Sequence, residues 1–340
     1  MTAFTELFPA RDVLDYTNGS AQVQSFAMEA LFPTRKVASN DLLTIVDKEV
    51  LPQIAHVHAF DTEAEKATYD QEVSTGEVFK YARKEVFDEV KMIELKEFKN
   101  AGLARFEPLA DNVLKSGVRL VNSVNAALEL ARVQVLTTGK FAQKDPNGND
   151  VTLDYKLDKS SQLAAVKFTD ASFDPIEWLV EQQQNAAFDM TRGLTSVKAL
   201  AALRANPNVV KRVLGVNSTM QTVMPADLDN YLLAQGLPLL RAYKGSYIDV
   251  DKAGKKVKKT FMDDKAIALF GDGELGETVF GVTAEESQLL DNKAVDQSQV
   301  GNVMLSTFST VDPITNTVLA TAVAAPTLAQ RYSLMNGTVL

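Results

Sequence analysis

A long run of regularly spaced apolar residues constrains the fold of this chain most strongly. Between positions 109 and 138, apolar or small side chains recur every three or four residues, a spacing that puts them on one face of an α-helix. They are Leu109, Val113, Gly117, Leu120, Val124, Leu128, Ala131 and Val135. Pro108 stands near the start of the pattern and Gly139 follows its end, as at many helix termini. The pattern predicts one long helix that packs one face against another element.

The N-terminal segment, residues 1–50, has a different character. Its apolar residues come in short groups that Pro9, Gly19 and Pro33 interrupt, and no group is long enough to form a core alone. We therefore predict an extended arm with one or two helical turns, whose aromatic side chains need another surface to bury against. These aromatic residues are Phe4, Phe8, Phe26 and Phe32. The alternative is an ordinary N-terminal part of a globular domain.

A highly charged segment follows the arm. Residues 51–60 have the character of a strand, whereas residues 61–99 carry many charges of both signs and cannot bury much of their own surface. Over residues 77–98, apolar side chains are scattered among the charges with neither a clear helix period nor a clear strand period. We predict a long two-limbed loop that lies on a neighbouring molecule. The aromatic residues expected in this contact are Phe79, Tyr81 and Phe87.

Turn and cap signals divide the region after the long helix. Asn147-Gly148 separates two short strand patterns, which predicts a hairpin over residues 140–155. A helix-rich stretch is expected to begin at Asp174-Pro175 and to run to about Leu214. Asn206-Pro207 is expected to break it internally, because proline cannot continue a preceding helix.

The last third of the chain has mainly strand character. Residues 222–310 predict short strands and turns around one or two short helices, and residues 317–334 predict a final apolar strand. The most apolar part of that strand, residues 317–328, is interrupted by Pro326 and is shorter than the roughly 20 residues that cross a bilayer. We expect a buried strand there and no membrane span.

Charge and cysteine content limit the functions that this chain can have. The net charge is −9 and the isoelectric point is near 5.0, so a surface that neutralises many nucleic-acid phosphates would be a local exception. The chain has no cysteine and therefore no disulfide, thiolate nucleophile or cysteine zinc site, which is consistent with assembly in a reducing cytoplasm. The first residues lack the basic start and the apolar run of a secretory signal, so we expect no export.

One glycine-rich motif imitates a dinucleotide-binding loop. Residues 271–276 read GDGELG and follow an apolar strand pattern. The next residues, 278–282, have strand character where a dinucleotide loop requires a helix N-terminus, and the acidic side chains of Asp272 and Glu274 lie inside the loop. We interpret the motif as a turn.

Two patterns that could bind metal are also incomplete. Residues 249–254 resemble the start of a calcium loop, but Ala253 occupies position 5, and Thr260 occupies position 12, where a bidentate glutamate is needed. His56 and His58 are the only histidines, and no third ligand is evident near them. Two histidines without cysteine also give a serine–histidine–acid triad little support. We therefore predict no enzyme activity and assign no catalytic, cofactor-binding or metal-binding residue.

Three blocks of sequence resemble one family of viral proteins. The first is VQVLTTGK at residues 133–140, followed by the Asn-Gly hairpin and Asp154-Tyr155. The second comprises AYKGSY at residues 242–247 and AIALFG at residues 266–271. The third begins at Asp312-Pro313 and continues through residues 321–339. These blocks lie within residues 105–340. In their residues and in their order they resemble the lambda-type major capsid protein E family of tailed bacteriophages.

The resemblance implies a fold of the α+β class, the Hong Kong 97-type phage capsid fold. On this mapping residues 1–50 are the N-terminal arm and residues 51–99 the extended loop. Residues 100–173 form a peripheral domain with a long spine helix, residues 174–310 form the axial domain, and residues 311–340 return to the peripheral domain. The order of arm, charged loop, long helix and mixed domain agrees with the pattern of the residues themselves.

The resemblance also implies a function. A major capsid (head) protein of this family self-assembles, as hexamers and pentamers, into the icosahedral shell that encloses the double-stranded DNA of a tailed phage. It implies assembly in the host cytoplasm and a place in the virion, a separate scaffolding protein, a portal and a possible decoration protein. No sequence-specific DNA binding, cofactor or membrane is expected. The alternatives are the shell protein of an encapsulin-type nanocompartment and, with less support, a nucleotide-dependent enzyme.

Overall fold

The computed structural model describes residues 10–20, 22–47, 71–100, 106–144, 148–250, 254–288 and 296–340, and the chain divides into two compact units. Each unit is assembled from segments that lie far apart in the sequence. Unit 1 comprises Met1–Leu42, Gly76–Glu129 and Thr278–Pro326. Unit 2 comprises Leu43–Thr75, Leu130–Glu277 and Thr327–Leu340.

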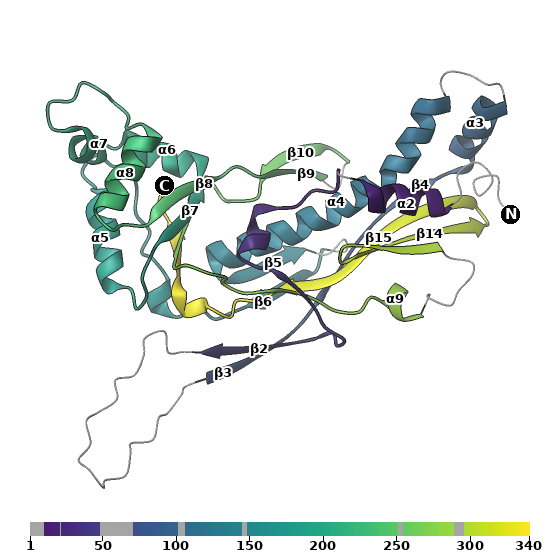
Figure 1. The fold of residues 1–340 in the computed structure, drawn as a ribbon, viewed down its shortest axis with the longest axis horizontal. Helices are drawn as coiled ribbons and strands as arrows, with labels where there is room; N and C mark the ends of the chain where they lie inside the picture. The colour runs from purple at the N-terminus through teal and green to yellow at the C-terminus, as the bar shows by residue number, and fades with distance from the viewer. Residues whose placement is uncertain are drawn as a thin grey trace, which may run out of the picture. The chain divides into compact units, whose positions relative to one another are not determined.

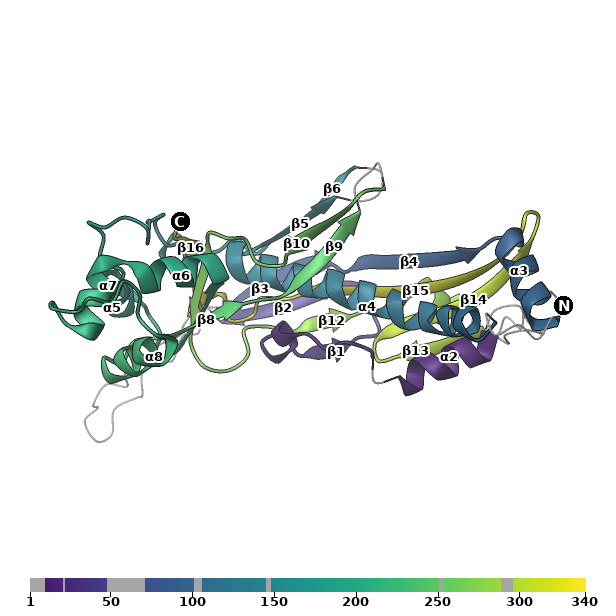
Figure 2. The same ribbon diagram turned by 90° about the horizontal axis from the view of Figure 1, so that it is seen from above.

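A mixed sheet forms the framework of unit 1. Its strands are ordered β1 (Thr34–Lys36), β12 (Thr278–Phe280), β15 (Ile314–Pro326), β14 (Val303–Val311) and β13 (Asp296–Val300), and β4 (Phe79–Phe87) also pairs with β15. Both views show β15 between neighbouring strands along its length (Figures 1 and 2). Most of β15 is buried and consists of small or β-branched residues, as expected for a central strand covered on its faces.

The long helix predicted from the sequence is confirmed as α4 (Phe106–Thr138), which begins three residues before the pattern does. Its residues up to Glu129 belong to unit 1. There it shares a core with the sheet and with helix α2 (Ala10–Gly19). The core includes Val13, Leu14, Val113, Leu120, Val124, Leu128, Leu305, Val318, Ala320 and Ala322. The apolar residues that recur every three or four positions in α4 therefore form one buried face of the helix, as expected.

Two segments of unit 1 were not anticipated in this form. The N-terminal segment contains α2, which is ten residues long, and the short helix η1 (Ala27–Ala30), whereas we expected one or two helical turns. Residues 79–100, which showed no clear period, fold as β4 and helix α3 (Glu89–Asn100). A short helix, α9 (Ala284–Gln288), follows β12, in the region where one or two short helices were expected.

Unit 2 is built on a second sheet with helices packed against it. The strand order is β16 (Leu334–Thr338), β11 (Ala266–Phe270), β7 (Arg192–Ser196) and β8 (Leu239–Tyr243). Strand β11 is antiparallel to both of its neighbours, and β7 is parallel to β8. The helices are α5 (Pro175–Asn185), α6 (Val197–Ala205), α7 (Pro207–Leu214) and α8 (Pro225–Ala234). The predicted helix-rich stretch and its break at Asn206-Pro207 are confirmed, although β7 lies inside the stretch.

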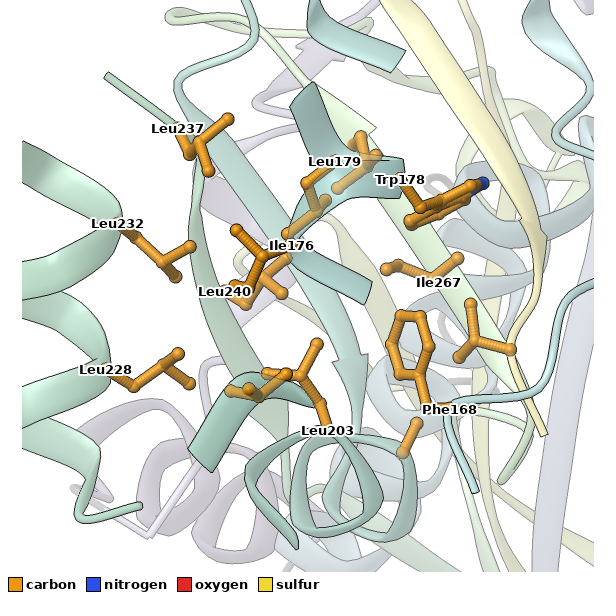
Figure 3. Packing of buried hydrophobic residues seen from close by; sticks show 14 of the residues in the cluster. Phe168, Ile176, Trp178, Leu179, Leu203, Leu228, Leu232, Leu237, Leu240 and Ile267 are labelled. Carbon is orange, nitrogen blue, oxygen red and sulfur yellow. The ribbon is translucent and has the colours of Figure 1, made fainter. Parts of the chain in front are cut away.

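The core of unit 2 lies between these helices and the sheet. Figure 3 shows Ile176 and Leu179 of α5 facing Leu240 and Ile267 of the strands, with Phe168 and Trp178 beside them. The ring of Phe168 stacks against that of Phe173 and meets that of Trp178 edge-on, with centroids 6.4 and 5.8 Å apart. This aromatic group fixes the segment before α5 to the helices.

Polar side chains cap the first turns of α5, α6 and α7 in unit 2. The carboxylate of Asp174 accepts hydrogen bonds from the backbone N–H groups of Ile176 and Glu177 at the start of α5. The hydroxyl of Ser196 accepts one from Ala199 at the start of α6. The side-chain oxygen of Asn206 accepts one from Asn208 at the start of α7. Such caps satisfy N–H groups that have no partner within the helix.

Three two-stranded ribbons complete the described fold. The expected Asn-Gly hairpin is confirmed as β5 (Lys140–Lys144) paired antiparallel with β6 (Asp150–Asp154). Strands β9 (Ser246–Val250) and β10 (Lys256–Thr260) form a second hairpin. The third ribbon pairs β2 (Asp41–Asp47) with β3 (Gln71–Glu77). The predicted strand over residues 51–60 lies outside the described residues.

The end of the chain differs from the expected single strand. Residues 317–334 were predicted as one strand, whereas β15 ends at Pro326, the short helix η3 (Arg331–Ser333) follows, and β16 begins at Leu334. The break falls where the chain passes from the sheet of unit 1 to that of unit 2. Proline at the end of β15 cannot donate a ladder hydrogen bond, which favours termination there.

Candidate subunit interfaces

The aromatic residues predicted to contact neighbouring molecules differ in their exposure. Phe4 and Phe8 lie outside the described residues. Phe32 and Phe87 are buried within unit 1, so their side chains present little surface to a second molecule. Phe26, Phe79 and Tyr81 are only partly buried, and Tyr81 packs against the core of unit 1. Of the described residues, Phe79, Tyr81 and Phe87 share one face of strand β4, and Phe26 and Phe32 lie on other segments.

Side chains of α4 hold the N-terminal segment in place within unit 1. Asn122 accepts a hydrogen bond from the backbone N–H of Gln24 at 2.8 Å and donates one to the carbonyl of Gln22 at 2.9 Å. The buried carboxylate of Glu129 accepts one from the N–H of Met28 at 3.0 Å. Further along, β1 pairs with β12. The described part of the N-terminal segment from Gln22 onward therefore anchors on its own chain.

Strand β4 likewise belongs to the sheet of its own chain. It pairs with β15 from Phe79 opposite Ala324 to Phe87 opposite Asn316. Its polar side chains contact neighbouring elements of unit 1: Arg119 of α4 lies 3.2 Å from the carboxylate of Glu85. The half-exposed side chains of β4 are thus held by a paired strand of the sheet, and sites on strands are more precisely positioned than sites on loops.

A partly buried ion pair links β4 to α9. Lys80 Nζ lies 2.8 Å from Glu285 Oε1, and Glu285 is only 8% exposed. Burial raises the pKa of Glu285, but the hydrogen bond and positive charge of Lys80 and weaker hydrogen bonds, including one from the backbone, together outweigh it, so the pKa lies below the ordinary value of a glutamate. The carboxylate is therefore favoured in its charged form in the folded chain.

This ion pair predicts a pH dependence of stability. Because the folded-state pKa of Glu285 is lowered, its stabilising contribution is present above the unfolded pKa, roughly 4.3, and is lost as pH falls through the folded pKa. We expect Glu285→Gln to lower the free energy of unfolding by about 1 kcal/mol at neutral pH, with the difference from the original chain shrinking below about pH 4. Urea unfolding followed by circular dichroism at several pH values measures this. A difference that stays constant down to pH 3 would contradict it.

The glycine-rich motif at residues 271–276 forms a turn, as expected, and β12 follows it as a strand. Its backbone carbonyls are occupied by an arginine: Arg192 Nη2 donates to the carbonyls of Gly271 and Gly273, both at 2.7 Å. Asp272 accepts a hydrogen bond from Thr191 at 2.7 Å. A phosphate-binding loop must instead present N–H groups at a helix N-terminus. The motif therefore has a structural role.

Gly276 is required by close backbone packing. A Cβ atom at this position would overlap the carbonyl of Thr327, whose N–H in turn donates to the carbonyl of Glu277 at 2.6 Å. We expect Gly276→Ala to lower the free energy of unfolding of unit 2 by about 1–3 kcal/mol. Trp178, the only tryptophan, lies in unit 2 and reports this unfolding by its fluorescence. Gly19→Ala, which places a Cβ in open space, is the control and is expected to be nearly neutral.

In the residues that the structure describes, the other motifs considered from the sequence show no ligand geometry. Strands β9 and β10 flank the calcium-loop motif, and Thr260, at the position of the missing calcium ligand, donates its hydroxyl to the carbonyl of Met262. His56 and His58 lie outside the described residues. Within the described ranges, no group of three or more His, Cys, Asp or Glu side chains could hold a metal ion. Among the helices described there, none is long and apolar enough to span a bilayer.

Exposed apolar side chains mark surfaces that the chain does not cover itself. They occur on α3, around α8 and on the β9–β10 hairpin. The residues concerned are Val90 and Ile93, then Val216, Met220, Met224 and Leu233, and finally Ile248, Val250 and Val257. Clustered exposed apolar residues are typical of interaction surfaces.

Comparison with solved structures identifies the architecture. No family model and no curated protein matches the chain. The chain is similar to a protein assigned as a prophage capsid protein of Escherichia coli CFT073, with a TM-score of 0.61 and 14% identity over 97% of this chain and 99% of that one. The chain has the Hong Kong 97-type capsid fold.

A second structure supports this fold. A phage-related protein from Bordetella bronchiseptica RB50 is similar over 96% of this chain and 95% of its own, with a TM-score of 0.51 and 13% identity. The α+β class and the Hong Kong 97-type fold expected from the sequence are therefore confirmed. Similarity at this level of identity establishes the fold alone.

Proposed function

We propose that this chain is the major capsid protein of a tailed phage, of the lambda type, and that it self-assembles into the icosahedral shell around the double-stranded DNA genome. The observation that carries this proposal is the capsid fold shared along almost the whole chain, over 97% of its length and 99% of the prophage protein. A fold shared along both chains is expected for building blocks that pack against copies of themselves in the same way.

We assign each segment of the chain to a part of the capsid fold in the order of the sequence. Residues 1–50 act as the arm, residues 51–99 as the extended loop, residues 100–173 as the peripheral domain, residues 174–310 as the axial domain, and residues 311–340 as the return to the peripheral domain. The long helix α4 and the hairpin that follows it support the peripheral assignment. Strands β7, β8 and β11, with the helices packed against them, support the axial assignment of residues 174–270. Strands β12 to β14 instead join the sheet of unit 1, and β16 joins the sheet of unit 2.

We propose that many weak contacts between subunits, which close into rings, stabilise the shell. Arm and loop of one subunit lie on its neighbours, each contact is modest, and the closing of hexamers, pentamers and finally the shell makes the assembly stable. Modest single contacts also allow wrongly placed subunits to leave during growth. In this scheme the chain needs no catalytic group, and its function is structural.

The proposal includes the expected partners. A separate scaffolding protein directs shell size, a portal occupies one vertex, and a decoration protein can cover the outer surface. Assembly takes place in the host cytoplasm, and the finished protein resides in the virion. The net charge of −9 fits a container that encloses DNA without specific binding, because an acidic wall does not hold the polyanion tightly.

Sedimentation velocity tests the proposal. The purified chain, 37.1 kDa as a monomer, is expected to form rings or shells of many subunits, alone or with any scaffolding protein encoded beside it. A species that remains monomeric or dimeric under both conditions would contradict it. Particles that copurify with a dense enzyme cargo in place of DNA would indicate a cellular compartment instead.

The aromatic residues of the arm give a more specific test. Replacing Phe4 and Phe8 together with serine is expected to lower the yield of assembled particles severalfold, because aromatic anchors dominate many interfaces. Fluorescence of Trp178 in the purified variant is expected to match that of the original chain, showing that unit 2 is folded. Unchanged assembly would remove these two residues from the interface.

A further inference from the structure

The β9–β10 hairpin presents an uncovered face with a defined chemistry. Ile248 and Val250 of β9 point to the same side of the ribbon, and the residues directly opposite them in the register are Lys258 and Lys256. Directly opposed residues of an antiparallel pair share one face. Ile248 is 62% exposed and Val250 42% exposed. We call these four residues the hairpin surface.

The opposite face of the hairpin is used by its own chain. The ring of Tyr247 packs against that of Phe261 with centroids 5.0 Å apart. Lys259 Nζ lies 2.6 Å from the carboxylate of Asp249. Lys256 and Lys258, by contrast, are exposed and form no ion pair within the described residues. The hairpin surface is therefore an apolar pair flanked by two uncompensated positive charges, on a chain whose net charge is −9.

Helix α3 carries a surface of complementary chemistry. Val90 is 65% exposed and Ile93 51% exposed. Glu94 and Glu97 are exposed and pair with no basic side chain in the described part of the chain. These four residues stand at positions i, i+3, i+4 and i+7, which lie on one face of a helix. Met92, on the opposite face, is buried in the core of unit 1. We call the four exposed residues the helix surface.

The two surfaces match in spacing as well as in charge. Side chains two residues apart on a strand are about 6.6 Å apart, and side chains three residues apart on a helix are about 5–6 Å apart. Two apolar side chains of each surface can therefore meet while the lysines face the glutamates. Burial of aliphatic side chains beside opposite charges favours a protein partner, because isoleucine and valine gain little from the phosphates of a nucleic acid.

We propose that the hairpin surface of one subunit docks on the helix surface of a second copy of this chain. This inference rests on the proposed function, since it names a contact within the assembled shell. It assigns to the shell a contact between a basic hairpin and an acidic helix, separate from the arm and loop contacts.

Charge reversal in separate chains tests the contact. The hairpin variant carries Lys256→Glu and Lys258→Glu, and the helix variant carries Glu94→Lys and Glu97→Lys. Each variant alone places like charges opposite one another and is expected to lose at least about tenfold of the assembled fraction in sedimentation velocity. An equimolar mixture of the two variants is expected to assemble again, because each chain then meets a complementary partner. A chain with all four changes is also expected to assemble.

Matched controls separate this contact from other effects. Lys159→Glu with Lys167→Glu alters the net charge by the same amount at two exposed lysines of unit 2, and is expected to assemble normally. If the four-change chain assembles and the mixture does not, the contact forms within one chain and the proposal is wrong. Full assembly of both separate variants would also overturn it.

Two further outcomes are informative. If the hairpin variant assembles normally but loses double-stranded DNA that the original chain retains on a filter, the hairpin surface contacts nucleic acid and the proposal fails. If the original chain itself never assembles, the proposed function fails together with this contact. If the original chain assembles, the loss of assembly in each variant and its recovery in the mixture test only the contact between hairpin surface and helix surface.

Discussion

Replacing Phe168 with alanine is expected to destabilise unit 2 by about 3–5 kcal/mol. The side chain has no exposed surface and lies in contact with the rings of Phe173 and Trp178. Its removal leaves a cavity between the segment before α5 and the helices, which surrounding side chains can fill only in part. Urea unfolding of the unassembled chain, followed by the fluorescence of Trp178, measures the loss directly.

A volume-conserving substitution serves as the control for Phe168. Phe168→Leu keeps most of the buried apolar volume and is expected to cost less than about 1.5 kcal/mol. Equal losses for alanine and leucine would show that the aromatic contacts, and not the filled volume, determine stability at this position. A loss below 1 kcal/mol for alanine would contradict the packing described for unit 2.

Replacing Asn206 with alanine is expected to lower the free energy of unfolding of unit 2 by about 3 kcal/mol. Its side-chain oxygen caps α7, and its Nδ2 donates to the carbonyls of Phe168, Asp170 and Phe173 at 2.9, 3.0 and 3.2 Å. Asn206 is only 2% exposed, so water cannot easily replace these bonds. One amide therefore joins the start of α7 to the turn that precedes α5.

Two variants divide the contribution of Asn206 into its parts. Asn206→Asp retains the capping oxygen but loses the donor group, and is expected to be at least as destabilising as alanine, because a carboxylate would face three carbonyls. Asn230→Ala, at an exposed position of α8, is the matched control and is expected to lie within about 0.5 kcal/mol of the original chain. If Asn206→Asp were as stable as the original chain, the donor bonds would contribute nothing.

Features that depend on neighbouring residues in the sequence were predictable. The long helix α4 has apolar residues at helical spacing because one of its faces packs on a sheet. The Asn-Gly turn specified the β5–β6 hairpin, and Asn206-Pro207 specified the boundary between α6 and α7. In each case the local sequence preference agrees with the tertiary packing, so the element can be predicted from one sequence.

Features that depend on distant partners were missed. Strand β7 lies within a helical stretch and exists because it pairs with β11 and β8, which follow it by dozens of residues. Helix α3 showed no clear period because Val90 and Ile93 are exposed on the face opposite Met92. The N-terminal segment was expected to need another surface for its aromatic side chains, and the sequence did not show that Asn122 and Glu129 of its own chain bind its backbone at Gln24 and Met28.

The interface residues are the hardest to predict, for a physical reason. Burial within a chain leaves a periodic trace in its sequence, whereas burial between copies leaves exposed apolar residues that resemble ordinary surface positions. Phe32 and Phe87 were chosen as aromatic anchors and are buried within unit 1, while the exposed pairs of α3 and the β9–β10 hairpin carried no motif. Only the register of β9 and β10 shows that Ile248 and Val250 share a face with two lysines.

Negative-stain electron microscopy of the overexpressed chain, alone and with any scaffolding protein encoded beside it, tests the central claim most directly. The account predicts closed icosahedral shells, or curved sheets and rings of five and six subunits. A uniform field of small monomers or dimers under both conditions would contradict it.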